Sequence, residues 1–119
     1  MIQIFGTNKN FDCKSAQRFF KERRIPFQFI DLKEKEMSAA EFESVVALLS
    51  KKCASRQQAI ESLIDEKSKD FAQIAYLDDS EKYEKLFENQ QKLLKQPVCR
   101  NGKIDATVGL CPKTWEGWK

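Results

Sequence analysis

The sequence of 119 residues contains no histidine. Histidine is the side chain that most often acts as a general base near neutral pH, so its absence excludes Ser-His and Cys-His catalytic pairs and histidine metal ligands. No apolar run approaches the roughly 20 residues that a membrane-spanning helix needs, and no charged, cleavable leader precedes the first apolar residues. We therefore expect a cytoplasmic protein without a membrane span.

A strong excess of one charge is also missing. The chain has 21 basic and 18 acidic residues, a net charge of +3. Because nucleic-acid binding usually requires a dense basic stripe, we expect no direct contact with nucleic acid. Hydrophobic residues make up 41% of the chain and include nine phenylalanines, which is enough for one core. We expect a single domain over residues 1–119.

The four cysteines do not follow a zinc-binding pattern, because no two of them lie two residues apart and no histidine can complete a site. In the cytoplasm they should be mostly reduced, and a chain with this many apolar residues does not need disulfides to fold. We therefore expect neither a metal nor a disulfide framework. The four are Cys13, Cys53, Cys99 and Cys111.

The hydrophobic pattern at the start of the chain predicts a β-α-β unit. Residues 1–5 and 27–30 are expected as strands and residues 12–24 as the helix between them. Asp12 is a candidate cap for the helix, and Pro26 favours its end at the preceding residue. Such a unit places its two strands in parallel with a right-handed crossover.

A helical insert is expected at about residues 38–94. It begins with a capping box formed by Ser38 and Glu41. A second helix is predicted over residues 56–66, and a third starts at Ser80 and continues through the apolar positions up to Leu94.

Two strands and a short helix are expected to follow the insert. Strands at residues 97–100 and 103–108 flank Asn101-Gly102, which is typical of a two-residue type I′ hairpin turn. Pro112 favours a final helix starting at that residue, with Trp115 and Trp118 packed on one face.

The most informative cysteine, Cys13, lies in the first turn of the first predicted helix. The helix dipole, together with Lys9 and Lys14, favours a reactive thiolate there, although Asp12 opposes it. The alternative is that Cys13 is a small buried residue continuing the apolar face of the helix, because buried cysteine is common and usually inert.

Several short segments, taken in order, resemble the arsenate reductase (ArsC) and Spx family of thioredoxin-like proteins along nearly the whole chain. The resemblance implies an α/β fold of the thioredoxin-like type: β-α-β, a helical insert, then β-β-α, with a small mixed sheet. The segments are Lys14-Ser15-Ala16, Ile25-Pro26-Phe27, residues 63–71, residues 93–98, residues 102–109 and residues 112–116.

The departures from this family concern its active site. The resemblance places the nucleophilic cysteine on Asn10 and keeps the second cysteine of Spx-like members as Cys13. Two of the three arginines that hold the oxyanion fall on Lys67 and Gln96, and the third has no counterpart. Pro97 is expected to follow a cis peptide bond. Because neither asparagine nor a single ammonium group replaces a nucleophile and an arginine clamp, we expect no arsenate reduction.

Three functions remain open. The first, which we favour from the sequence, is a glutaredoxin- or thioredoxin-like oxidoreductase that uses Cys13 without a resident cofactor, with glutathione as a potential co-substrate. The second is a redox-silent interaction module, for which the resemblance to Spx-like members implies RNA polymerase as a partner. The third is a sensor in which oxidation of Cys13 changes the affinity for a partner. The expected site comprises Cys13 as the catalytic residue and Asn10, Lys67, Gln96 and Pro97 as substrate- or partner-binding residues.

Overall fold

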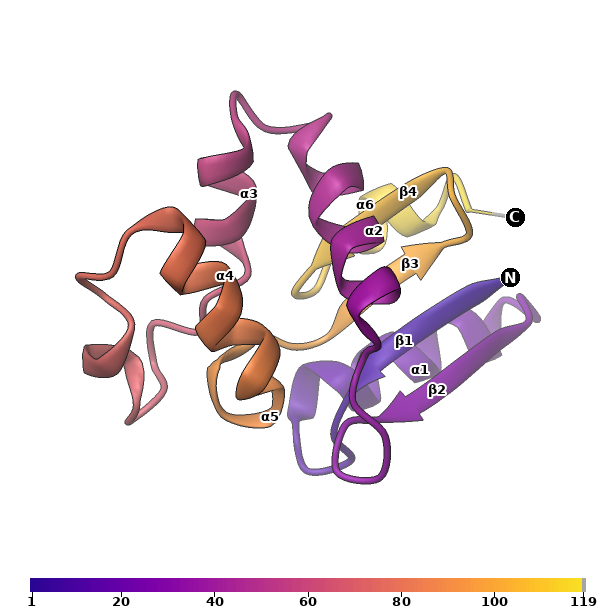
Figure 1. Cartoon of the computed structure of the whole chain (residues 1–119). Helices are drawn as coiled ribbons and strands as arrows, with labels where there is room; N and C mark the ends of the chain where they lie inside the picture. The colour runs from indigo at the N-terminus through magenta and orange to yellow at the C-terminus, as the bar shows by residue number, and fades with distance from the viewer. Residues whose placement is uncertain (119) are drawn as a thin grey trace.

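The computed structural model describes residues 1–118 and consists of a β-α-β unit, a helical segment and a β-β-α unit (Figure 1). The helical segment lies between β2 and β3 and includes a short 3-10 turn at Phe71–Gln73. None of the helices within residues 1–118 is both long enough and apolar enough to cross a membrane. In chain order the elements are β1 (Ile2–Gly6), α1 (Phe11–Glu22), β2 (Phe27–Asp31), α2 (Ala39–Ser50), α3 (Arg56–Ser62), α4 (Asp79–Glu88), α5 (Gln90–Leu93), β3 (Val98–Asn101), β4 (Asp105–Val108) and α6 (Pro112–Trp115).

The four strands form one mixed sheet in the order β2-β1-β3-β4. Strands β1 and β2 are parallel, as the β-α-β pattern predicts, whereas β3 runs antiparallel to both β1 and β4. The predicted thioredoxin-like arrangement with a small mixed sheet is therefore confirmed.

The two faces of the sheet are covered by different helices. One face packs against α1 and α6, where Phe20, Trp115 and Trp118 gather around Ile4. The other face carries Phe5 and Ala106, which pack against residues of α2 to α5. In Figure 1, α1 and α6 lie behind the sheet and α2 lies in front of it. The predicted burial of both tryptophans and the helix start at Pro112 are confirmed.

Helix α1 is capped differently from the prediction. It begins at Phe11, and Asn10 is the capping residue, whose Oδ1 accepts a hydrogen bond from the backbone N–H of Cys13 at 2.9 Å. Asp12 therefore lies inside the first turn and does not cap the helix. At the other end, the N–H of Ile25 donates to Phe20 O and the N–H of Arg24 donates to Lys21 O. This is a Schellman ending, in which the residue after the cap adopts the left-handed conformation.

Arg24 occupies that left-handed position with φ of +55°. Glycine accepts this conformation without the steric penalty of a side chain. We expect Arg24→Gly to raise the free energy of unfolding by about 0.5–1 kcal/mol, measured by urea denaturation. Arg23→Gly is the control, because Arg23 has φ of −93°, and it should lower stability. A loss of stability in Arg24→Gly would contradict this assignment.

The helical segment matches the prediction at its start and differs at its end. The capping box is confirmed, since Ser38 and Glu41 exchange both bonds. The predicted single helix from Ser80 to Leu94 is instead α4 and α5, separated at Asn89, and the predicted 56–66 helix ends at Ser62. The break positions the buried Gln90 side chain to bond both backbone groups of Met37. This pairing joins residues 53 positions apart, and local periodicity does not indicate it.

The hairpin also differs in its turn. Asn101 pairs with Asp105, so the connection between β3 and β4 is the three-residue loop Gly102-Lys103-Ile104, not the predicted two-residue turn. Gly102 supplies the positive φ, at +54°. Ile104 lies in the loop, 80% exposed, and does not share the buried face of Ala106.

Candidate functional site

The topology brings two distant segments together at the carboxyl end of β1. Phe5 in β1 pairs with Val98 in the antiparallel strand β3. The residues that follow Phe5 therefore lie beside those that precede Val98. This places Thr7 and the start of α1 next to Gln96 and Pro97. The Gln96–Pro97 peptide bond is cis, as predicted.

The side-chain amide of Gln96 connects these segments. Its Oε1 accepts hydrogen bonds from the Thr7 backbone N–H at 2.9 Å and from the Thr7 hydroxyl at 3.2 Å. The Cys13 thiol donates to the same oxygen at 3.6 Å. Gln96 Nε2 donates to Gln91 O at 3.4 Å. One neutral amide thus holds the loop after β1, the thiol and the start of β3 in place.

The Cys13 thiol is fully enclosed. The residue has 0% of its surface exposed, and a Cβ added to Gly6 would lie only 2.2 Å from its Sγ. Burial raises the pKa of the Cys13 thiol to about 11, and the negative charges of Asp12 and Asp31 act in the same direction, while a hydrogen bond from the Thr7 backbone acts against them. The expectation of a lowered pKa for this thiol is therefore wrong, because desolvation by burial is the largest influence on it.

Asn10 and Gln96 also occupy backbone donors that an anion would need. Asn10 Oδ1 takes the N–H of Cys13 and Gln96 Oε1 takes the N–H of Thr7. Free backbone N–H groups at a helix start are what attracts an oxyanion. In this chain one neutral side-chain oxygen takes the Cys13 N–H in the first turn of α1, and another takes the Thr7 N–H in the loop before the helix.

A cavity of about 570 Å³ lies beside this network, and Asn10, Lys67 and Gln96 all line it. Cys13 and Pro97 are not among its lining residues. The structure thus brings three of the five predicted site residues to one cavity and places the thiol behind them. The charged side chains on its wall are four acids and two bases: Asp12, Glu61, Asp65, Glu66, Lys67 and Lys95. This wall disfavours an anionic ligand.

The other three cysteines are free as well. Cys99 lies in the core between the sheet, α1 and α6, and burial raises the pKa of its thiol. Cys53 and Cys111 are half-buried, and the Cys111 thiol donates to Val108 O at 3.4 Å. Cys53 and Cys111 are therefore more accessible than the cysteine at the predicted site.

Sequence reasoning missed two participants, Gly6 and Thr7. Gly6 leaves the space that the Cys13 sulfur occupies, and Thr7 provides two of the donors that Gln96 accepts. In the sequence both residues indicate only the end of a strand. The close approach of Cys13 is the feature that requires glycine here.

Removal of the Gln96 side-chain oxygen should lower the stability of the protein. Gln96→Ala leaves a backbone N–H and two side-chain donors without their partner, and we expect the free energy of unfolding to fall by about 2 kcal/mol. Gln91→Ala is the matched control, because only its backbone oxygen takes part, and it should change stability by less than about 0.5 kcal/mol. Equal losses in the two variants, measured by urea denaturation, would contradict a bridging role for Gln96.

Comparison with known proteins supports the fold. No protein-family model matches the chain, and no curated protein matches it. Among solved structures, an arsenate reductase from Vibrio cholerae is 16% identical, with 99% of this chain and 97% of that chain covered and a TM-score of 0.79. An arsenate reductase (ArsC) related protein from Brucella melitensis is 17% identical, with 98% and 92% covered and a TM-score of 0.67.

A third similar structure, SACOL0876 from Staphylococcus aureus COL, is 21% identical to this chain. The alignment covers 98% of this chain and 96% of that chain, with a TM-score of 0.74. The similarity extends along the chain in all three cases, while the identities are low. The family resemblance of the sequence is thus confirmed at the level of architecture: the chain has the thioredoxin-like fold of the ArsC-type arsenate reductase structures.

Proposed function

We propose that this chain is a redox-silent protein-interaction module built on the ArsC-type fold. The observation that carries the proposal is the state of Cys13, whose thiol is buried, protonated and bonded to the neutral oxygen of Gln96. The thiolate is the nucleophilic form of cysteine, so this environment opposes thiol chemistry. Cys13 then serves as a core residue that packs against Gly6.

The same site argues against arsenate as a substrate. Asn10, at the position of the family's nucleophile, caps α1 with its side chain. The adjoining cavity has more carboxylates than ammonium groups, whereas an oxyanion needs preorganised donors and positive charge. Lys67 alone does not supply the fork of donors that an arginine offers.

Binding to a protein partner is supported by large apolar side chains at this end of the sheet. Phe11 is 81% exposed at the start of α1, and Leu110 is 49% exposed just after β4. Because β1 and β4 are both antiparallel to β3, the loops that follow β1 and β4 lie at the same end. Exposed apolar side chains at one end of a sheet offer surface that a protein partner can bury. RNA polymerase in the cytoplasm is the partner and location that the resemblance to Spx-like members suggests.

A second candidate is the thiol-disulfide oxidoreductase that the sequence favours, and the sensor, the third alternative, relies on the same thiol. The specific support is that the hydrogen bond from the Cys13 sulfur to the Gln96 side-chain oxygen is long, at 3.6 Å. Opening of the loop between β1 and α1 would expose the thiol to glutathione or to a protein disulfide. A mixed disulfide would then need a second thiol to resolve it.

An enzymatic assay with matched cysteine variants distinguishes the two functions. We expect no glutathione-dependent disulfide reduction, and no arsenate reduction with glutathione plus glutaredoxin or with thioredoxin, above the level of Cys13→Ser. Cys111→Ser is the matched control, since Cys111 is more accessible and lies outside the network. Turnover that Cys13→Ser abolishes and Cys111→Ser preserves would establish the oxidoreductase and refute the redox-silent proposal.

A further inference from the structure

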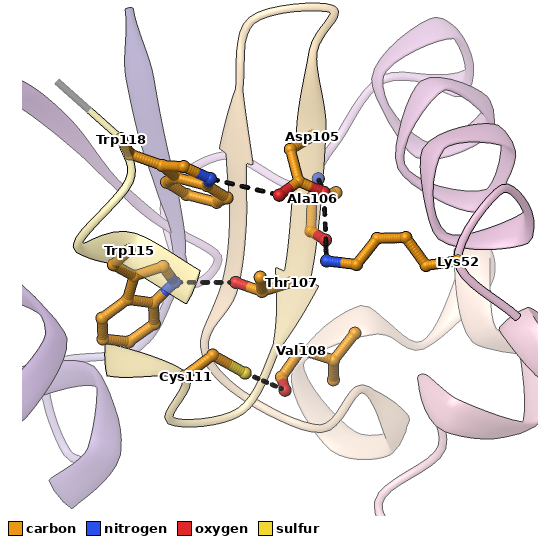
Figure 2. A network of polar contacts seen from close by, with 8 residues as sticks. All are labelled: Lys52, Asp105, Ala106, Thr107, Val108, Cys111, Trp115 and Trp118. Carbon is orange, nitrogen blue, oxygen red and sulfur yellow. Dashed lines mark hydrogen bonds and ion pairs between the residues drawn. The ribbon is translucent and has the colours of Figure 1, made fainter. Parts of the chain in front are cut away.

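The sheet has two edge strands, and side chains bond most of the outward backbone groups of one of them, β4. The N–H of Gly109 donates to Pro97 O across the β3–β4 pair. Because backbone groups alternate in direction along a strand, those of Ala106 and Val108 point outward. Asp105 Oδ1 accepts the Ala106 N–H at 2.8 Å, and Lys52 Nζ donates to Ala106 O at 3.0 Å (Figure 2).

The remaining outward oxygen of β4, on Val108, accepts the Cys111 thiol (Figure 2). Lys52 is held in position by an ion pair with Asp105 at 3.0 Å, and the Trp118 indole donates to the second oxygen of the same carboxylate at 3.1 Å. Side chains that fill the bonding groups of an edge strand prevent it from pairing with another chain. Within residues 1–118, side chains bond three of the four outward groups of Ala106 and Val108, all but the Val108 N–H, and this disfavours strand addition at β4.

The opposite edge strand, β2, is open. Leu32 N–H donates to Gly6 O at 2.8 Å across the parallel β1–β2 pair. By the same alternation, the backbone groups of Phe27, Phe29 and Asp31 point away from the sheet. The Asp31 oxygen accepts turn bonds from Glu34 and Lys35. Within residues 1–118 no partner is present for the outward groups of Phe27 and Phe29 or for the N–H of Asp31.

Strand β2 also lacks the features that protect an edge. Its sequence, Phe-Gln-Phe-Ile-Asp, contains no lysine, proline or glycine, and it pairs with β1 in an unbroken register without a bulge. Its apolar side chains are only half-buried. An edge of this kind is a template for an added strand.

We propose that the β2 edge pairs with the β2 edge of a second copy of this chain, in an antiparallel arrangement about a two-fold axis at Phe29. In this register Phe29 faces Phe29 of the other copy, and Phe27 faces Asp31. These are the residues whose backbone groups point outward, so they form hydrogen-bonded pairs of an antiparallel ladder. Across the axis the Phe29 groups bond each other and the Asp31 N–H donates to the Phe27 oxygen, on one self-complementary surface. The Asp31 oxygen keeps its turn bonds to Glu34 and Lys35, so the Phe27–Asp31 pair forms one of its two bonds.

The charges at the two ends of β2 also favour a second copy of this chain as the partner, in the same register. Arg24 lies in the turn before β2 and Glu34 in the turn after it, each five residues from Phe29, so an antiparallel two-fold places the end of β2 that carries Arg24 beside the end that carries Glu34 of the other copy, twice in the dimer. Both side chains are exposed. Arg24 also borders a groove of about 420 Å³ at the start of β2, which leaves room for an approaching side chain. Lys33 and Lys35 alternate with the glutamates of this loop, so the register decides which charge meets Arg24.

Charge exchange tests this interface directly. By analytical ultracentrifugation, the average mass of the unmodified chain should rise with concentration from 13.9 kDa towards twice that value, because a strand-edge interface is small and weak. Arg24→Glu and Glu34→Arg should each weaken association by about tenfold or more, since each homodimer then contains two like-charged pairs. A mixture of these two variants, and the double variant R24E/E34R, should associate again because every pair is then of opposite charge.

The control is Lys51→Glu, which changes the charge as much as Arg24→Glu does and lies on an exposed position next to α2. It should associate like the unmodified chain. A mass that stays at 13.9 kDa at all concentrations would overturn the proposal, as would association that Arg24→Glu leaves unchanged or that the mixture fails to restore. These results do not depend on Cys13, so a failure of the dimer proposal would not affect the proposed function, which the assay of the cysteine variants tests separately.

Discussion

Gly6→Ala should lower the free energy of unfolding by about 2–3 kcal/mol. The added Cβ would lie 2.2 Å from Cys13 Sγ and 3.5 Å from Gln96 Oε1. The sulfur can move aside only by giving up its bond to Gln96 and entering space that other core residues fill. Gly6 lies in the extended strand β1, a conformation that alanine adopts readily, so the loss reports the contact and not backbone strain.

A double-mutant cycle separates this contact from other effects. Cys13→Ala removes the sulfur and should cost about 1 kcal/mol by itself. In that background Gly6→Ala should cost much less, because the added methyl group then occupies the vacated space. Urea denaturation of the four proteins measures the coupling between the two positions. An equal cost of Gly6→Ala in both backgrounds would contradict the packing described for Cys13.

Much of the fold follows from local sequence signals. Apolar strands around an amphipathic helix, ended at Ile25-Pro26, predict the parallel β-α-β unit, and the Ser38–Glu41 capping box marks the start of α2. The signals fail where a distant partner decides the local structure. The break before Gln90 depends on Met37, and the three-residue hairpin loop depends on the pairing of Asn101 with Asp105.

The sequence predicts where the candidate site lies, but it does not predict the protonation state of Cys13. The spacing places Cys13 at the start of a helix, and the family resemblance implies that the Gln96–Pro97 segment faces the same loop; the structure has both features. The protonation state of Cys13 is set mainly by desolvation of the buried thiol. The burial of the thiol depends on the space beside Gly6 and on the contact with the Gln96 amide, which is 83 residues away in the sequence. No local pattern in the sequence reveals either feature.

Cys13 should be strongly protected from alkylation near neutral pH. Raising its pKa from 9.0 to about 11 lowers the thiolate fraction by about 100-fold, and burial of the sulfur slows the reaction further. Because the pKa is raised, the thiolate fraction of Cys13 should keep increasing up to about pH 11, whereas that of a thiol with an ordinary pKa levels off near pH 9. Gln96→Ala should increase the rate by opening access to the thiol.

The most direct test of a buried, protonated Cys13 is iodoacetamide alkylation of the native protein, followed residue by residue with mass spectrometry. The half-buried Cys53 and Cys111 serve as internal references, and the protein unfolded in urea gives the intrinsic rate of each thiol. We predict that Cys13 reacts at least about 100-fold more slowly than Cys53 and Cys111 at pH 7. Alkylation of Cys13 faster than that of Cys53 and Cys111 would contradict this account and favour a thiol-redox function.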